Sequence, residues 1–392
     1  MLSRRQTLAG LGALAAAPAW AREARLGFAN GDRPYTSAFA EKGEMILQRT
    51  RAPLLETPFE VFDEGVFTPN DRFYARWHYQ DIPLSVDPRA HRLKVTGAVN
   101  RPLSLSLAEL LKLPRVELAA VNQCSGNSRG FVGPRVAGAQ WGHGAMGNAL
   151  WTGVPLKAVL ERAGVKAGAV AVRFGGLDEP PPDAPRFLKS LAVDHALDGE
   201  VMIAFAMNGA SLPLLNGYPL RLVVPGWFST YWVKALSTIE VLDAADDNFW
   251  MKTAYRIPAT ADGGVAPGTS QFESVPINTM PPRSFVTNLR DGAVVPPGPR
   301  ALRGIAFGGA SAVAKVEISR DGGASWLPAT LGPDQGRYGF RRWEATSDFA
   351  PGTATLAVRC TAADGRVQPM RGVWNPGGYL YNAVEQLKVR VA

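Results

Sequence analysis

The chain has 392 residues, which is long enough for two domains. Of these residues 46% are hydrophobic and 19% charged, a composition that is typical of globular proteins and excludes global disorder. Its 42 basic and 34 acidic residues give a net charge of +8 without runs of lysine and arginine, which argues against a nucleic-acid partner. Two cysteines, Cys124 and Cys360, are too few for a disulfide framework, a four-thiolate zinc site or an iron–sulfur cluster.

Residues 1–21 have the features of an export signal. Arg4 and Arg5 precede a short apolar run, and the small-x-small pattern at 19–21 predicts cleavage after Ala21. The paired arginines indicate the twin-arginine pathway, which exports folded proteins, although an ordinary secretory signal remains the alternative. The apolar run is too short to span a bilayer. We therefore expect a soluble periplasmic protein without a membrane span.

From residue 22 to about 265 the pattern mixes short helices with strands. The expected helices lie at 107–113, 155–163 and 187–197. The expected strands are bounded by turn residues and lie at 92–99, 116–122, 170–174, 201–207 and 220–224. This pattern predicts an α+β domain over 22–265. A stretch rich in Gly, Pro, Ser and Thr at 258–282 predicts a connection to a second domain.

Beyond residue 266 the pattern becomes purely strand-like. Asp321-Gly322 is a hairpin turn signal between two of the expected strands. These strands lie at 301–307, 314–319, 325–329, 337–345, 353–361 and 386–391. Their short, even spacing predicts a β-sandwich over residues 266–392.

One common catalytic motif is present, the GxSxG pattern at 126–130, which in serine hydrolases places a nucleophile between a strand and a helix. Here the following residues include Gly133 and Pro134, which oppose a helix. The downstream histidines His143 and His195 stand in contexts that do not indicate an oriented base. A serine hydrolase is therefore disfavoured.

The same segment can be interpreted around Cys124, which follows an expected strand and precedes a turn that contains a glycine. A thiolate is a soft ligand that suits a redox metal, and this position can present it to a cavity. The alternative is a buried cysteine that acts as a small apolar side chain. Cysteine statistics alone favour the alternative, so the choice depends on the surrounding motifs.

Five segments of the chain resemble the sulfite oxidase family of molybdenum enzymes, in particular its bacterial periplasmic sulfite dehydrogenase branch. They are TPNDRFYARWH at 68–78, VNQCSGNSR at 121–129, GYPLRLVVPGWFSTYWVK at 217–234, MKTAYRIP at 251–258 and MRGV at 370–373. The resemblance covers nearly the whole chain after residue 21. It implies a mixed α/β molybdenum-cofactor domain followed by an immunoglobulin-like β-sandwich used for dimerisation.

The resemblance also implies roles for individual residues. Cys124 falls where the family ligates molybdenum, beside the dithiolene of a molybdopterin cofactor. Arg76, Arg129 and Arg371 fall at substrate-binding positions, and guanidinium groups bind oxyanions through forked hydrogen bonds. Tyr255 falls where the family has a pocket tyrosine that can serve in proton transfer.

Further positions match the family's cofactor contacts. His78 resembles a cofactor-side histidine, Arg221 and Lys234 lie in the stretch that holds the pterin phosphate, and Asp178 resembles the acidic residue that meets the pterin ring. The sequence also departs from animal members, which have a lysine where this chain has Ala137. Two further departures in the cofactor stretch are Asn216 and Trp232.

The resemblance thus predicts a periplasmic enzyme that oxidises sulfite to sulfate. With no haem-attachment motif and no cytochrome b5-like segment in the sequence, we expect no haem in this chain and an external c-type cytochrome as electron acceptor. The chain is expected to form a homodimer or a complex with a haem subunit. The alternatives are a sulfane dehydrogenase-type subunit, a nitrate reductase, a reductase of oxidised methionine, or a cofactor-free exported binding protein.

Overall fold

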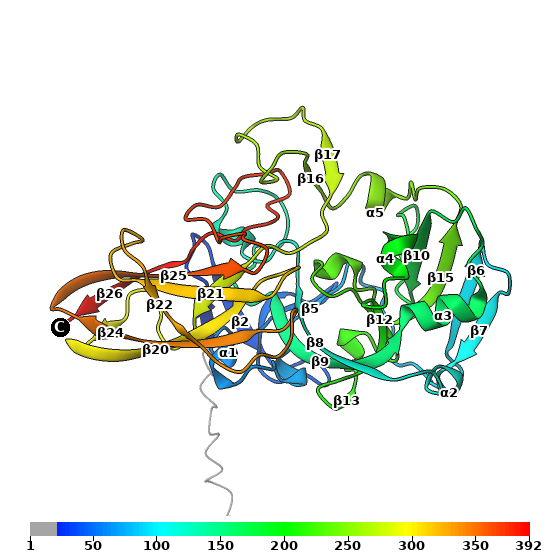
Figure 1. Cartoon of the computed structure of the whole chain (residues 1–392), viewed down its shortest axis with the longest axis horizontal. Coiled ribbons are helices and arrows are strands. Elements are labelled where there is room, and N and C mark those ends of the chain that lie inside the picture. The colour runs from blue at the N-terminus through cyan, green and yellow to red at the C-terminus, as the bar shows by residue number, and fades with distance from the viewer. Residues whose placement is uncertain (1–21) are drawn as a thin grey trace, which may run out of the picture.

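The structure is a computed structural model that describes residues 22–392. The predicted export signal and its cleavage site lie outside the described residues. Two bodies of β-sheet lie side by side and are joined along one flank (Figure 1). None of the helices between residues 22 and 392 is long and apolar enough to cross a bilayer.

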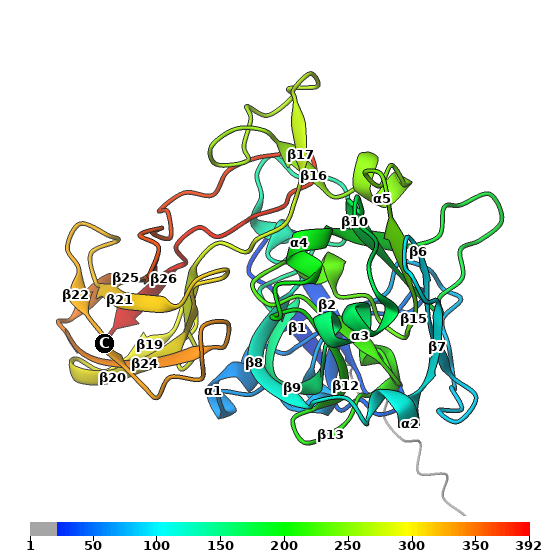
Figure 2. The ribbon, with the colours of Figure 1, turned by 45° about the vertical axis from the view of Figure 1, so that its right-hand side comes forward.

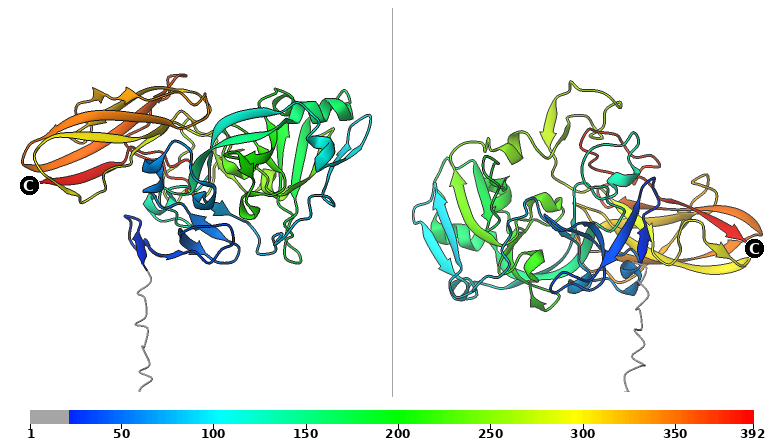
Figure 3. Two further views of the ribbon diagram at one scale, coloured as in Figure 1. Left: turned by 90° about the horizontal axis from the view of Figure 1, so that it is seen from below. Right: turned by 180° about the vertical axis from the view of Figure 1, so that it is seen from behind.

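The chain begins with an antiparallel five-stranded sheet near the junction of the two bodies (blue in Figure 3). Its strands follow chain order as β1 (Glu23–Arg25), β2 (Asp32–Thr36), β3 (Met45–Arg49), β4 (Leu54–Glu56) and β5 (Ala75–Arg76). Two short turns of helix, α1 (Val61–Glu64) and η1 (Asn70–Arg72), separate β4 from β5. The edge strand β5 carries Arg76 and leads directly to His78.

A mixed sheet forms the outer part of the first body and has the order β11-β10-β15-β6-β7. All its neighbours are antiparallel except β15 and β6, which are parallel. The strands are β6 (Arg92–Gly97), β7 (Leu103–Ser106), β10 (Ala171–Gly176), β11 (Leu188–Ala192) and β15 (Leu236–Leu242). Helix α2 (Leu107–Leu110) begins at Ser106, which forms a capping box with Glu109.

The third sheet forms the centre of the first body, in the order β13-β12-β9-β8, with β14 also paired to β12. Its strands are β8 (Val116–Gln123), β9 (Met146–Pro155), β12 (Met202–Met207), β13 (Ala210–Ser211) and β14 (Arg221–Val223). Helix α3 (Leu156–Ala163) follows β9 and ends at Gly164 in the left-handed conformation. Further short helices are η2 (Arg129–Phe131), α4 (Val193–Ala196), η3 (Leu214–Asn216), η4 (Ser229–Tyr231) and α5 (Phe249–Lys252).

The second body is a sandwich of two sheets, the predicted immunoglobulin-like architecture (Figures 1 and 2). One sheet contains β18 (Arg283–Val286), β20 (Gly298–Phe307), β24 (Arg341–Phe349) and β23 (Thr330–Leu331). The other contains β19 (Val294–Val295), β26 (Gln386–Val391), β25 (Gly352–Ala362), β21 (Val313–Ser319) and β22 (Leu327–Pro328). Side chains from both sheets, including Trp343, Leu356 and Cys360, form a buried core between them. Cys360 is fully buried there, which agrees with a packing role.

The α+β class and the sandwich are confirmed, while several local predictions are wrong. The helix expected at 187–197 is mostly the strand β11, because its backbone pairs with β10 from Leu188 to Ala192 and only α4 remains helical. The expected connection at 258–282 contains half of a small hairpin, β16 (Arg256–Pro258) with β17 (Ser274–Pro276). This hairpin spans the predicted domain boundary at residue 265, which stays a prediction.

Candidate active site

A cavity with about 430 Å³ of space, part of it open to solvent, lies inside the first body, between the central sheet and the edge strand β5. Its walls come from segments far apart in the chain. The polar and charged residues that line it are Tyr74, Arg76, His78, Asn122, Cys124, Ser125, Asn216, Arg221, Ser229, Thr230, Lys234 and Tyr255. Six of the nine residues proposed from the sequence therefore meet at one cavity: Arg76, His78, Cys124, Arg221, Lys234 and Tyr255.

Strand β8 delivers Cys124 to this cavity. It pairs with β9 along its whole length, from Val116 opposite Gly153 to Gln123 opposite Met146. The Cys124 amide continues the pattern by donating to the Ala145 carbonyl at 2.9 Å, after which the chain turns, with the Asn127 amide donating to the Cys124 carbonyl at 2.9 Å. A well-paired strand end is a rigid place from which to present a thiol.

Several polar atoms around the cavity are buried without a hydrogen-bond partner from the described residues. Buried polar groups in proteins are nearly always paired, so a group of unpaired ones indicates a polar ligand. These atoms are Arg76 Nη1, Asn122 Nδ2, Ser125 Oγ, Arg221 Nε and Thr230 Oγ1. Two guanidinium groups, an amide, two hydroxyls and a thiol fit a group that combines a metal, a heteroatom-rich ring and a phosphate. The residues therefore suit the molybdenum–pterin cofactor.

Positive charge dominates the electrostatics of the cavity. Burial, reinforced by the charges of Arg76 and Lys234, holds the pKa of His78 well below its usual value, so its imidazole is neutral at pH 7. Further positive charge reaches His78 from Lys189 and Arg49. Such a site favours anionic ligands.

His78 and Tyr255 form a hydrogen-bonded pair in the cavity wall. The Tyr255 hydroxyl lies 2.6 Å from His78 Nε2, and the His78 ring stacks on Phe187 with centroids 3.7 Å apart. Burial raises the pKa of Tyr255, so the phenol keeps its proton at neutral pH. On its other side Tyr255 stacks on Tyr379, with centroids 5.7 Å apart. Tyr379 belongs to the loop between β25 and β26, so the second body helps to build this wall.

Arg221 and Lys234 stand at the opposite part of the lining. The Arg221 guanidinium donates from Nη1 to the Asn216 carbonyl at 2.9 Å and from Nη2 to Asn122 Oδ1 at 3.0 Å. Burial lowers the pKa of Lys234, and the Arg221 charge adds to this effect. Asp178 is buried and opposes it with a negative charge, but it does not line the cavity.

The other two predicted arginines do not line the cavity. Arg129 is held beside it, where Nε donates to the Gly377 carbonyl at 2.9 Å and Nη1 to the Ala139 carbonyl at 3.0 Å. Its charge still reaches Tyr255, whose pKa it lowers slightly against the effect of burial. Arg371 is exposed and lines a separate, open groove of about 2480 Å³ between β1 and the sandwich. The expected convergence of three arginines on one pocket is therefore not found in this structure.

Sequence reasoning missed Lys189, a fully buried cation near the cavity. Its ammonium donates to the Trp250 carbonyl at 2.7 Å and lies over the rings of Tyr231 and Tyr255, 4.4 and 5.6 Å from their centroids. Burial lowers its pKa to about 7. The available signal was a lysine inside an apolar stretch, and it is meaningful only once β11 is identified as a buried strand.

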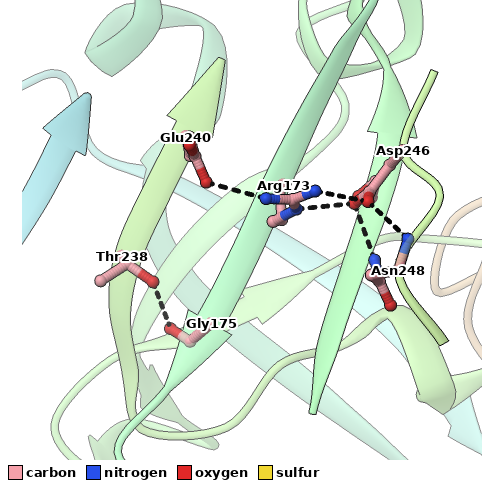
Figure 4. A network of polar contacts seen from close by, with 7 residues as sticks. Arg173, Gly175, Thr238, Glu240, Asp246 and Asn248 are labelled. Atoms are coloured by element: carbon pink, nitrogen blue, oxygen red, sulfur yellow. Dashed lines mark hydrogen bonds and ion pairs between the residues drawn. The ribbon is translucent and has the colours of Figure 1, made fainter. Parts of the chain in front are cut away.

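A polar network holds the segment that carries the Trp250 carbonyl. Figure 4 shows Arg173 between two carboxylates, with Nη2 2.6 Å from Asp246 and Nη1 3.1 Å from Glu240. Asp246 in turn accepts from the amide and side chain of Asn248, at 3.0 and 2.8 Å. Asn248 is the N-cap of α5, so the network fixes the helix on which Trp250 stands.

The GxSxG motif has a more ordered environment than the sequence indicated. Ser128 Oγ lies 2.7 Å from His143 Nδ1, and His143 Nε2 lies 3.4 Å from Glu385. The expectation that His143 is not an oriented base is therefore wrong. Ser128 is nevertheless fully buried and also accepts a hydrogen bond from Arg283, so no substrate can reach its hydroxyl in this conformation.

Comparison with known proteins agrees with this arrangement. Residues 79–250 match the family model for the oxidoreductase molybdopterin binding domain, and residues 274–392 match that for the Mo-co oxidoreductase dimerisation domain. Sulfite oxidase of Gallus gallus is 36% identical over 351 residues, covering 84% of this chain and 74% of the relative. Human mitochondrial sulfite oxidase is 34% identical over 359 residues, covering 86% of this chain and 64% of its own length.

A solved structure gives the same result at the level of the fold. The sulfane dehydrogenase SoxCD from Paracoccus pantotrophus superposes with a TM-score of 0.76 at 27% identity, covering 91% of this chain and 88% of that chain. The present chain spans about two thirds of the length of the mammalian relatives that it matches. Its cavity, its cofactor-binding domain and its dimerisation domain all agree with one assignment. The chain belongs to the sulfite oxidase family of molybdenum-dependent oxidoreductases.

Proposed function

We propose that the protein oxidises sulfite to sulfate at a molybdenum–pterin cofactor bound in the cavity. The proposal rests chiefly on Cys124, a thiol at the wall of a pocket in which five other buried polar atoms have no partner among residues 22–392. The matches to human and chicken sulfite oxidases support sulfite as the substrate.

The cofactor would be held by residues at opposite ends of the cavity. Cys124 would ligate the molybdenum, and Arg221 and Lys234 would bind the pterin phosphate, for which charged and forked donors are suited. His78 would contact the pterin from the Tyr255 side. When bound, this cofactor supplies two-electron oxygen-atom transfer, which no side chain can perform.

Sulfite would be bound by the groups that face the same space. Arg76 is the cation best placed for this, because its Nη1 is buried in the lining without a partner among residues 22–392. Tyr255 keeps its proton and can donate it in a hydrogen bond to an oxyanion or to His78. The neutral His78 can accept that proton, so the pair can hold or pass one proton beside the substrate. Arg129 adds positive charge from behind the wall without direct contact.

The location and the electron partner complete the proposal. The Arg4-Arg5 pattern supports export to the periplasm. The lack of a haem-attachment motif in the sequence supports an external c-type cytochrome as acceptor, with no haem bound to this chain. The match to a dimerisation domain supports a homodimer, or a complex with a haem subunit.

A second candidate is a sulfane dehydrogenase, which would act on a sulfur group bound to a carrier. The observation in its favour is the likeness to SoxCD over 91% of this chain. Of the three arginines that the sequence led us to expect around a free oxyanion, only Arg76 lines the cavity. The two candidates share the cofactor and differ in the substrate.

The test is to purify the exported protein, measure molybdenum and pterin, and assay sulfite-dependent reduction of ferricyanide, which replaces the natural acceptor. About one molybdenum per chain with sulfite turnover is expected, and Cys124→Ser should lose both. Turnover with a thiol-bound sulfane but not with sulfite would select the second candidate. Unchanged metal content in Cys124→Ser would refute the role of Cys124.

A further inference from the structure

The turn that carries Cys124 is held from the second body by a buried arginine. Arg283 begins β18, the first strand of the sandwich, and is only 1% exposed. Its Nη2 donates to Ser128 Oγ at 3.0 Å and its Nη1 lies 3.3 Å from Gln123 Oε1. Gln123 immediately precedes Cys124, and Ser128 closes the turn that follows it. A single guanidinium from the sandwich thus holds both ends of the segment 123–128.

The same turn is also held by hydrogen bonds within the first body. Asn127 donates from Nδ2 to Gln123 Oε1 at 3.1 Å and accepts from the Ala145 amide at 3.0 Å. The Ser128 amide donates to the Gly142 carbonyl at 2.7 Å. Gln123 Oε1 is therefore shared between Asn127 and Arg283, so the intradomain and interdomain contacts meet at one atom.

A second contact from the sandwich reaches the turn through His143. Ser128 Oγ lies between His143 Nδ1 at 2.7 Å and Arg283 Nη2 at 3.0 Å, and His143 Nε2 faces Glu385 at 3.4 Å. Glu385 directly precedes β26 of the sandwich. The buried Ser128 hydroxyl thus contacts two side chains: Arg283, which belongs to the sandwich, and His143, which faces Glu385 of the sandwich.

The charge distribution favours a structural use of this arginine. Arg283 has two neutral side-chain acceptors, its Nε has no partner among the described residues, and its guanidinium lies 4.5 Å from the Phe285 ring centroid. Burying a cation here costs free energy, and this cost lowers the pKa of Arg283 to about 10. A neutral residue would avoid that cost, but it would not supply the rigid guanidinium fork that donates to two acceptors at once. We therefore attribute the role of Arg283 to the geometry of its two donors.

We propose that Arg283 is a positioning residue for the active site, through which the sandwich domain fixes the orientation of the Cys124 turn. The sandwich then has a role in each chain that does not depend on dimerisation. The effect of Arg283 on metal binding rests on the proposed role of Cys124 as the molybdenum ligand. The effect of Arg283 on the orientation of the turn does not depend on that role.

The test compares variants of Arg283 with a matched interdomain control in the full-length holoenzyme. Arg283→Ala removes both contacts, whereas Arg283→Lys keeps the charge and can restore one of them. Arg303→Ala is the control, because Arg303 of β20 forms another interdomain ion pair, with Asp63 at 2.5 Å, and does not contact residues 123–128. Ser128→Ala is a second test variant. It removes the hydroxyl that accepts from Arg283 and contacts His143, without removing a buried charge.

Two measurements are independent of turnover. The first is the rate at which iodoacetamide alkylates Cys124 while the molybdenum is withdrawn by a chelator, with Cys360 in the sandwich core as the internal reference. The second is the electron paramagnetic resonance spectrum of the one-electron-reduced molybdenum, which responds to the orientation of its ligands. Arg283→Ala is expected to alkylate at least tenfold faster at Cys124 and to shift the spectrum, with Ser128→Ala and Arg283→Lys in between.

The control decides the interpretation. Arg303→Ala is expected to melt at a lower temperature than the wild type while leaving both measurements unchanged. Equal effects of Arg283→Ala and Arg303→Ala, or wild-type behaviour of both Arg283→Ala and Ser128→Ala, would overturn the inference. If Arg283→Ala does not fold, Ser128→Ala and Arg283→Lys decide it by the same criteria. Metal retention in Cys124→Ser would refute only the proposed role of Cys124 as molybdenum ligand. Faster alkylation of Cys124 in Arg283→Ala would still support the positioning role of Arg283.

Discussion

The buried lysine Lys189 leads to a prediction about stability and pH. Its pKa is about 7 in the folded protein against 10.5 in an unfolded chain, a difference that corresponds to about 5 kcal/mol at about 1.4 kcal/mol for each pKa unit. The folded-state pKa is the lower one, so between pH 7 and 10.5 the unfolded chain binds a proton that the folded chain does not. Stability from this group therefore rises with pH across that window.

Lys189→Met should remove this contribution. The variant also loses the hydrogen bond to the Trp250 carbonyl, at a cost of about 1–3 kcal/mol. The difference in the free energy of unfolding between variant and wild type should therefore favour the variant at pH 7 and favour the wild type near pH 10.5. The change between these limits is expected to be several kcal/mol. Lys42 and Lys234 have lowered pKa values too, but they are present in both proteins, so their effects cancel.

The assay is denaturant unfolding of the full chain at steps between pH 6 and 10.5, followed by tryptophan fluorescence. Lys157→Met is the control, since Lys157 is half-exposed on α3 and makes only a 4.0 Å contact with Glu161. Its stability difference from wild type should be small and independent of pH. A pH-independent difference for Lys189→Met would refute the lowered pKa of the buried Lys189 amine.

Three further predictions concern the cavity and the sandwich. Arg76→Gln should raise KM for sulfite about tenfold or more, because a charged hydrogen bond to the oxyanion is lost, and steady-state kinetics that show only a fall in kcat would contradict this. Tyr255→Phe should lower kcat by about tenfold to a hundredfold while molybdenum content stays unchanged, as metal analysis beside the assay will show. Trp343→Ala should destabilise the sandwich by about 3–5 kcal/mol, measured by calorimetry, because Trp343 is fully buried between the two sheets.

Local patterns in the sequence were sufficient where structure depends on near neighbours. The strand predicted at 116–122 corresponds to β8, and Cys124 directly follows its end as expected. The six strands predicted beyond residue 300 correspond to β20, β21, β22, β24, β25 and β26, whereas the short strands β18, β19 and β23 were not predicted. By contrast, Lys189 was missed because a lysine is normally a surface residue, and only the pairing of β11 with β10 shows that it points inward.

Contacts between distant segments could not be predicted in this way. Arg371 was assigned to the pocket from a short motif, but its position depends on the path of a long loop, and that path leaves it in the outer groove. The link from Ser128 through His143 to Glu385 joins residues up to 257 positions apart, so no local pattern reports it. The residues that line the cavity could be predicted from sequence motifs, whereas the contacts that hold those residues in place could not.

The wall beside Tyr255 has a consequence for the order of events during synthesis. Gly377 accepts from Arg129, and Tyr379 stacks on Tyr255, yet both belong to the last 16 residues of the chain. A ribosome-bound chain that still lacks these residues has an incomplete pocket, however well its first 250 residues have folded. Insertion of the cofactor into a finished site must therefore follow the synthesis and folding of residues 377–379.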